Sequence, residues 1–328
     1  MLSPTAANGP RGRPLAMREP PPHVSDAEVL AAVREHWDDA VAEVAHLPVG
    51  FGAHHWAAGD ETGRRLFVTY DSLGRRHTAA SLESTYTATA SLAGDLDFVL
   101  APGASRSGAH TVPLADGALS ASPWVDGSSG GGPLRDRDEA EGTAAMLNRL
   151  HAAAPPPGIR LWEPLVTARY AAELALALGR PWDEGPYAAH ARQALSDRIA
   201  DIGRWVASYH RLADEARARQ WVATHGEPHS ANQLVTATGR LLVDWESLRL
   251  APPERDLRVL VQDGHADLCR PDWSMVEMFD LEWRLDEIAS YARWFAAPHT
   301  GTASDEVSWG GLRGELERAE WAPPTAAT

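Results

Sequence analysis

The sequence predicts an α+β chain in which a part rich in β-strands precedes a longer helical part. Three observations support this order. Short runs of β-branched and aromatic residues, such as Arg64 to Tyr70, occur early in the chain. The glycine-rich stretch from Asp126 to Pro133 interrupts this pattern. Beyond it, apolar residues recur at helical spacing over long stretches. The fold class is therefore α+β, with a lobe boundary between residues 125 and 126.

The N-terminal lobe is expected to span residues 25–125. Residues 1–24 are rich in Pro, Gly, Ala and Arg and are expected to form a disordered tail. Ser25 and Glu28 fit a capping box, which predicts the start of the first helix. The other elements expected in this lobe are strands near 41–47, 64–70, 98–100, 111–114 and 118–125, and a helix at 81–93.

The C-terminal lobe is expected to span residues 126–328. Apolar spacing predicts helices, and a hairpin is expected at 225–246. After residue 297 the chain is expected to be looser. The predicted helices are 138–151, 162–179, 187–213, 256–264 and 274–296.

Composition limits the classes of partner. The 328 residues carry 30 basic and 45 acidic side chains, a formal charge of −15, which argues against nonspecific binding of nucleic acid or of an anionic membrane. Cys269 is the single cysteine, so there is no internal disulfide, as expected in a reducing cytoplasm. No apolar run reaches membrane-spanning length, and the first residues lack the apolar core of a signal peptide. We therefore expect a cytoplasmic protein.

The stretch from His225 to Glu246 carries the clearest chemical pattern. A short polar loop with Glu227 and Asn232 precedes a brief apolar strand that ends in Asp244. A Thr-Gly turn between loop and strand predicts a hairpin that brings these three side chains together. Amide and carboxylate oxygens suit a hard cation such as Mg²⁺, and a carboxylate can take a proton. The alternative is a solvated polar loop followed by a core strand.

This stretch resembles the catalytic core of the aminoglycoside phosphotransferase family, kinases of antibiotics and other small molecules with a protein-kinase-like fold. His225, Gly226 and Asn232 match the family's loop, and Asp244 matches its metal-binding aspartate. Glu227 stands where the family usually has a catalytic Asp. The resemblance, which covers roughly residues 26–296, implies a two-lobed fold with a small β-rich N-terminal lobe and a larger helical C-terminal lobe.

The resemblance also implies an activity and a set of roles. The γ-phosphoryl group of ATP or GTP would pass to a hydroxyl group of a small molecule, with antibiotic resistance as one outcome. Asn232 and Asp244 would bind Mg²⁺, and Glu227 would orient or deprotonate the acceptor hydroxyl. His225 would brace the loop, and Glu246 would support the metal site.

Nucleotide binding is assigned to two further segments. Gly50 and Gly52 lie between two predicted strands, where glycines let backbone amides approach phosphates. The resemblance makes them the loop that covers the nucleotide; the alternative is an ordinary turn. Backbone groups near Trp124 and Val125 would hold the base, by analogy with the segment that connects the lobes of kinases.

The chain contains no lysine, although kinase-like folds carry one on the third strand of the small lobe. The matching position is Thr69 or a neighbour, and Glu83 is the helix residue expected to face it. Arginine is a larger, planar donor and no equivalent replacement. His54 and His55 either contact phosphate or substrate or are simply strand residues, and we assign them no role. The arginines near this strand, which either replace the lysine or are solvated turn charges, are Arg64, Arg65, Arg75 and Arg76.

The missing lysine and the longer Glu227 raise a rival interpretation, a pseudokinase that kept the fold and lost the chemistry. The acceptor is open among antibiotics, sugars, choline-like alcohols and nucleosides. Residues 256–286 carry eight acidic and three basic side chains, a balance of −5. This acidity favours a cationic acceptor, unless it belongs to an ordinary solvated helical face.

Overall fold

The computed structural model describes residues 19–50, 53–74, 77–134 and 136–322. By their internal contacts, these residues form two compact units. The sheet unit joins the chain up to Leu161 with the segment Val222–Ala251, and the helical unit joins Trp162–Trp221 with the chain from Pro252 onward. The predicted active-site stretch belongs to the sheet unit. The lobe boundary predicted between residues 125 and 126 does not coincide with this division into compact units, and it stays a prediction.

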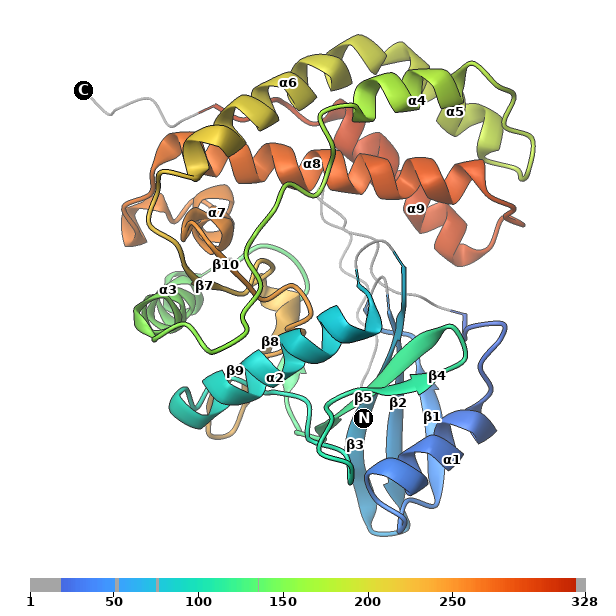
Figure 1. Cartoon of the computed structure of the whole chain (residues 1–328), viewed down its shortest axis with the longest axis vertical. Helices are drawn as coiled ribbons and strands as arrows, with labels where there is room; N and C mark the ends of the chain where they lie inside the picture. Colours follow the sequence, from blue (N-terminus) through green and yellow to red (C-terminus); the bar gives the residue numbers. More distant parts are fainter. Residues whose placement is uncertain (1–18, 51–52, 75–76, 135, 323–328) are drawn as a thin grey trace. The chain divides into compact units, whose positions relative to one another are not determined.

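The sheet unit is built on an antiparallel sheet of five strands in the order β1-β2-β3-β5-β4 (Figure 1). The central pair β2–β3 sets His55 opposite Thr69. Because side chains alternate between the faces of a strand, neighbouring residues serve different sides of this sheet. The strands are β1 (Glu43–Leu47), β2 (Ala53–Asp60), β3 (Gly63–Ser72), β4 (Val112–Leu114) and β5 (Gly117–Pro123).

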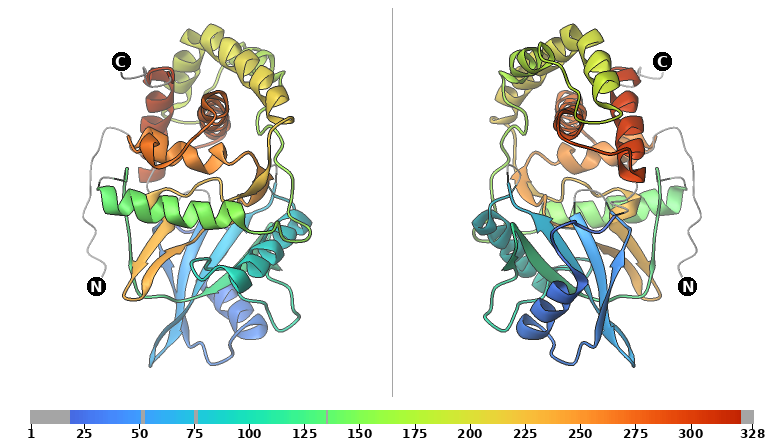
Figure 2. Two further views of the ribbon diagram at one scale, coloured as in Figure 1. Left: turned by 90° about the vertical axis from the view of Figure 1, so that its left-hand side faces the viewer. Right: turned by 90° about the vertical axis from the view of Figure 1, so that its right-hand side faces the viewer.

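One face of the sheet is closed by helix α1 (Asp26–His36), which begins with the predicted capping box of Ser25 and Glu28. Its apolar side chains form a core with the buried residues of the strands, Trp56 among them. Figure 2 shows the helix lying against the strands. Val24 is buried in the same core. The last residue of the expected disordered tail, Val24, is thus part of the packed core. Residues 1–18 of that tail lie outside the described residues.

The opposite face, here called the inner face, carries His55, Thr69 and Asp71. Helix α2 (Ala79–Asp95) packs on this side, with Leu82 and Tyr86 against Ala118 of β5. The inner face is therefore polar along β2 and β3 and apolar where α2 covers it.

The glycine-rich stretch is a strand rather than a free linker. β6 (Ser128–Ser129) pairs with β8 (Gln233–Thr236), which forms the predicted hairpin with β9 (Gly239–Leu242). A Cβ atom on Gly127 would lie 2.7 Å from the backbone oxygen of Val235. Glycine is thus needed here because two backbones approach closely. The prediction of a linker took the same glycines as a sign of flexibility.

Two short strands and one helix frame the hairpin. β7 (Val222–Thr224) and β10 (Arg249–Ala251) form an antiparallel pair that the sequence analysis did not predict, and α3 (Arg137–Ala152) packs on β7. Residues 98–100, expected to be a strand, form a single bridge: Leu242 N–H donates to Phe98 O at 2.7 Å, and Leu100 N–H donates to Leu242 O at 3.1 Å. The end of β9 is thereby fixed on both sides.

The helical unit is organised around the long helix α8, which packs against α5, α6, α7 and α9. The helix expected at 162–179 begins only at Tyr170. Pro164 disfavours helical backbone at Glu163, but it does not account for the non-helical residues that follow it. The helix expected at 187–213 is two helices that meet at Arg198. The tail expected to be loose contains α9, started by a capping box of Thr302 and Asp305. The helices are α4 (Tyr170–Leu178), α5 (Ala188–Asp197), α6 (Ile199–Ala216), α7 (Glu254–Gln262), α8 (Trp273–Ala296) and α9 (Ala303–Glu317).

Some of the acidic side chains in residues 256–286 are internal. Glu282 is buried and accepts hydrogen bonds from Trp162 Nε1 (2.8 Å) and the Tyr209 hydroxyl, and burial raises its pKa to about 7. Asp280 is buried beside Arg318, with 2.9 Å between carboxylate and guanidinium. These acids are bonded inside the unit, so the balance of −5 overstates the charge that faces solvent.

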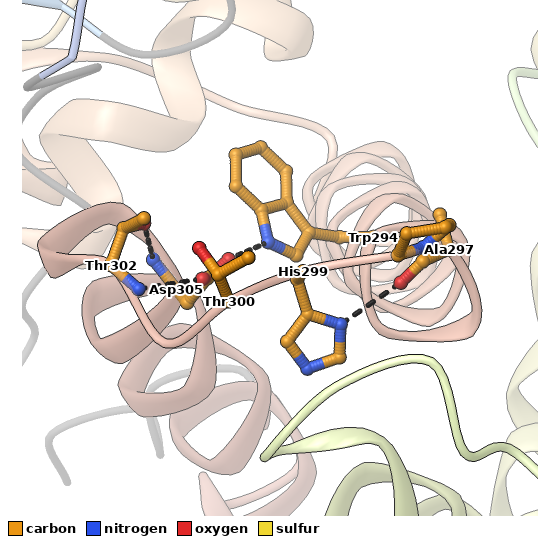
Figure 3. Close-up of a pocket in the computed structure, with 7 residues that line it drawn as sticks. Trp294, Ala297, His299, Thr300, Thr302 and Asp305 are labelled. Atoms are coloured by element: carbon orange, nitrogen blue, oxygen red, sulfur yellow. Dashed lines mark hydrogen bonds between the residues drawn. The ribbon is translucent and has the colours of Figure 1, made fainter.

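A pocket of about 370 Å³ lies where α8 connects to α9 (Figure 3). Trp294 Nε1 donates to Asp305 at 2.7 Å, and His299 Nδ1 donates to the backbone oxygen of Ala297 at 2.9 Å. These bonds hold the connecting loop in place, and the pocket contains none of the predicted site residues. Among the described residues, no helix is both long and apolar enough to cross a membrane.

We predict that Gly127→Ala destabilises the protein by about 1–3 kcal/mol, because the new methyl group would overlap the β8 backbone. Gly131→Ala is the matched control in the same stretch, since a Cβ there meets nothing within 4 Å. Its effect should stay within about 0.5 kcal/mol. Denaturant unfolding of both variants measures the difference, and equal stabilities would contradict the β6–β8 pairing.

Candidate active site

His225 ties the loop after β7 to the end of β9. Its buried ring donates from Nε2 to the Val243 backbone oxygen (2.9 Å) and accepts at Nδ1 from the Glu227 amide (3.2 Å). Since the carbonyl can only accept, these partners assign the neutral tautomer with its proton on Nε2. The ring also meets Trp245 edge-on, with centroids 4.5 Å apart. One side chain thus fixes both segments.

Asn232 makes the second connection between loop and strand. Its Nδ2 donates to the Glu227 backbone oxygen at 3.0 Å, and its own backbone oxygen accepts from the Val243 amide at 2.9 Å. Because Nδ2 is engaged as a donor, Oδ1 is the side-chain atom that can act as a ligand. The structure therefore brings Glu227, Asn232 and the end of β9 together, as the hairpin prediction required.

Asp244 follows β9 in a left-handed conformation, with φ of +70°. Non-glycine residues seldom adopt this region, although Asp tolerates it better than most. Its side chain is exposed, while Leu242 and Trp245 beside it are buried. Such a conformation turns the carboxylate out of the strand direction, and it persists because the neighbouring residues are fixed.

Carboxylates accumulate around Asp244. Burial, the charge of Asp244 and then that of Glu227 raise the pKa of Glu246 well above its usual range. Burial and the charge of Asp244 raise the pKa of Asp71, on the inner face of β3, to about 7. Within the described residues, Oε2 of Glu246 is buried without a hydrogen-bond partner. A bound cation would relieve this repulsion.

The donor set can be compared with the needs of Mg²⁺. Asn232 and Asp244 supply one amide and one carboxylate oxygen, which suit a cation that keeps several waters. No three His, Cys, Asp or Glu side chains in the described ranges are grouped as a metal site. Asn232 and Asp244 are only two ligands, and one of them is an amide. They fit Mg²⁺ through the chemistry of their oxygens, with water completing the coordination.

Glu227 is half-buried, and its Oε2 lies 3.8 Å from Nε2 of His229. The backbone of Glu227 is held by His225 on one side and Asn232 on the other. The longer side chain is therefore carried by a fixed backbone. The sequence analysis did not identify His229. Its position two residues after Glu227 could have indicated that it lies near this carboxylate.

Kinase-like folds are expected to connect β3 and α2 through a lysine and a glutamate. Other residues make this contact here. Tyr86 of α2 donates its hydroxyl to Asp71 of β3 at 3.2 Å. Glu83, expected to face β3, instead accepts from the amides of His110 (2.9 Å) and Thr111 (2.8 Å). Asp71 lies two residues beyond Thr69 and so shares its face, a spacing that could have identified it.

The arginines near β3 are engaged elsewhere. Arg65 donates to Asp60 at 2.8 Å, and the guanidinium of Arg64 lies 4.7 Å from the ring centre of Trp124. Arg75 and Arg76 lie outside the described residues. Neither described arginine takes the position expected for the lysine.

The predicted nucleotide-binding residues are partly visible. Gly50 has φ of +74°, a conformation that favours glycine, while Gly52 lies outside the described residues. The Trp124 amide donates to Arg65 O at 2.9 Å and is thus used in strand pairing, and Val125 follows it half-buried. Base binding near Trp124 and Val125 therefore stays a prediction that needs other backbone groups.

Comparisons with known proteins show the family of this chain. A sequence model described as the Phosphotransferase enzyme family matches residues 43–300. This chain belongs to that phosphotransferase family. Protein StrN of Streptomyces griseus is 31% identical to the chain over 229 residues, which are 65% of this chain and 69% of StrN.

Solved structures with a similar fold are themselves kinases. Spectinomycin phosphotransferase APH(9)-Ia, in complex with ADP and spectinomycin, has a TM-score of 0.67 at 15% identity, over 88% of this chain and 94% of that one. A microcompartment-associated aminopropanol kinase has a TM-score of 0.57 at 13% identity, over 89% and 95%. At such low sequence identity, the structural similarity establishes the fold alone. It confirms the α+β, protein-kinase-like class with a β-rich N-terminal and a helical C-terminal part.

We predict that Asp71→Asn stabilises the protein at alkaline pH. The folded protein holds the Asp71 proton up to about pH 7, whereas the unfolded chain releases it near pH 4. The stability that Asp71 contributes is therefore full below about pH 4 and is lost as the pH rises through 7. The variant should gain at most about 4 kcal/mol over wild type at pH 8 and little at pH 4.

Unfolding by urea from pH 4 to 8 measures this difference. Tyr86 can still donate to the amide oxygen, so the variant keeps its contact with α2. A difference independent of pH would show that Asp71 does not titrate in this range.

Proposed function

We propose that this phosphotransferase transfers the γ-phosphoryl group of ATP or GTP to a hydroxyl group of a small molecule. The observation that supports the proposal is the paired bonding of His225 and Asn232, which holds the loop of Glu227 against Val243, the residue before the exposed Asp244. The nucleotide and antibiotic in the APH(9)-Ia structure support the same pair of substrates here. Antibiotics are therefore among the acceptors to test, together with amino alcohols and sugars.

Mg²⁺ would be held by Oδ1 of Asn232 and the carboxylate of Asp244, with Glu246 behind them. When bound, the ion supplies positive charge that offsets the charge of the phosphates. The chain's own contribution is to keep these oxygens in place, through the backbone bond between Asn232 and Val243 and the left-handed conformation of Asp244. The raised pKa of Glu246 supports a site that favours a cation.

Glu227 is the residue we assign to the acceptor. Its carboxylate would accept the proton of the substrate hydroxyl while the hydroxyl oxygen bonds to the γ-phosphorus and the bond to the leaving diphosphate breaks. His225 holds the amide of Glu227, so it acts as a positioning residue. Carboxylates on Glu227, Asp244 and Glu246 also favour an acceptor that carries an amine near its hydroxyl.

We predict that Mg²⁺ together with ATP or GTP raises the melting temperature, whereas nucleotide alone raises it little. At 100 times Kd the stabilisation is about 2.7 kcal/mol, enough to measure in a thermal melt. Asp244→Asn should keep the fold and lose this shift. Asp97→Asn, at an exposed carboxylate elsewhere in the sheet unit, is the control and should retain it. No shift of the wild type with either nucleotide at millimolar Mg²⁺ would favour the pseudokinase.

We predict that Glu227→Gln lowers kcat about 100-fold or more and changes KM little, because it removes the proton acceptor and keeps the shape. Glu227→Asp, which restores the residue usual in the family, should keep activity or raise it. Steady-state kinetics with the best acceptor from a screen provide the measurement. Wild-type rates for Glu227→Gln would exclude this carboxylate from the reaction.

A further inference from the structure

His55 lies on the inner face of β2, where the chemistry proposed above gives it no task. Its ring is 8% exposed and is held in place by two neighbours from β3. Nδ1 lies 3.1 Å from the Thr69 hydroxyl, and the Phe67 ring packs on it with centroids 5.0 Å apart. Since Thr69 marks the expected position of the absent lysine, His55 directly adjoins that position.

The contact with Thr69 decides which nitrogen of the His55 ring carries the proton. Burial, and less strongly the charges of His54 and His46, lower the pKa of His55 to about 4, although nearby Asp244 acts to raise it. The ring is therefore neutral near pH 7, with one donor and one acceptor nitrogen. We assign the Thr69 hydroxyl as the donor to Nδ1, which leaves the proton on Nε2.

Nε2 lies beside the described end of the predicted phosphate loop. A Cβ atom on Gly50 would lie 2.7 Å from it, so the backbone of the loop passes the ring closely. Asp244 is near enough to influence the ring electrostatically. The donor thus lies close to Gly50 and within electrostatic reach of Asp244, two residues that the phosphates would approach.

Among the residues that the structure describes near this position, the side chains named above bring no positive charge to a phosphate. Thr69 is neutral, and Asp71 is a carboxyl group. Arg64 lies over Trp124, and Arg65 is paired with Asp60. A polyphosphate placed here needs a donor as well as the metal ion, because the surrounding carboxylates repel it.

We propose that His55 makes the phosphate contact for which kinase-like enzymes use a lysine, by donating Nε2–H to a non-bridging oxygen of the bound nucleotide. This inference rests on the proposed function. A hydrogen bond from a neutral imidazole carries less charge than an ammonium group. It follows that the metal ion carries more of the phosphate neutralisation than it does beside a lysine.

The test compares a nucleotide with its nucleoside, using ATP and adenosine or GTP and guanosine, whichever pair the wild type binds with Mg²⁺. His55→Leu should weaken binding of the triphosphate about 10- to 100-fold, as expected for one hydrogen bond to a charged group, and leave the nucleoside unchanged. His55→Gln places an amide N–H near the position of Nε2 and should restore most of the affinity.

His54→Gln is the matched control. His54 is the neighbouring histidine, equally buried, but it faces the core beneath α1. This variant should change stability without changing the preference for triphosphate over nucleoside. Isothermal titration provides the affinities, and a thermal melt of each variant verifies folding.

The outcomes separate the two proposals. If the wild type binds neither triphosphate, the proposed function fails. If it binds one and His55→Leu binds it equally well, or loses the triphosphate and nucleoside to the same extent, the role of His55 is overturned. Should His55→Leu not fold, Thr69→Val removes only the hydroxyl that orients the ring. A selective loss of several-fold for the triphosphate is expected, and an unchanged ratio would contradict the proposal.

Discussion

The paired hydrogen bonds of one buried imidazole hold the active site together. His225 fixes the loop that carries Glu227 and, through Val243, the strand end that carries Asp244. The bond accepted at Nδ1 requires the neutral ring, which is fully buried and meets Trp245 edge-on. Asn232 repeats the connection with its own backbone. The strained conformation of Asp244 is sustainable only because the residues before it are fixed in this way.

Charge is the second constraint on this site. Buried or half-buried carboxylates surround the position of the phosphates, and the raised pKa values of Asp71 and Glu246 record the free energy that their charges cost. A kinase-like enzyme with a lysine can hold nucleotide partly through that side chain. Without one, the proposed site would rely on His55 and a bound metal ion, so its electrostatic balance would depend on what it binds.

Local rules predicted the parts of this fold that local physics determines. The capping box at Ser25, the β-branched and aromatic residues of β3 and the Thr-Gly turn between His225 and Asp244 each express a short-range preference, and each leads to the right element. The failures have non-local causes. Gly127 looked like linker because only the approach of Val235, more than 100 residues away, reveals why glycine is needed there.

The contact of Tyr86 with Asp71 has a consequence for how α2 is attached to the sheet. An ion pair between lysine and glutamate is weakened by dissolved salt wherever solvent reaches it. Here a phenol donates to a buried carboxyl group, and both partners are shielded from mobile ions. The Tyr86–Asp71 contact that attaches α2 should therefore be indifferent to ionic strength.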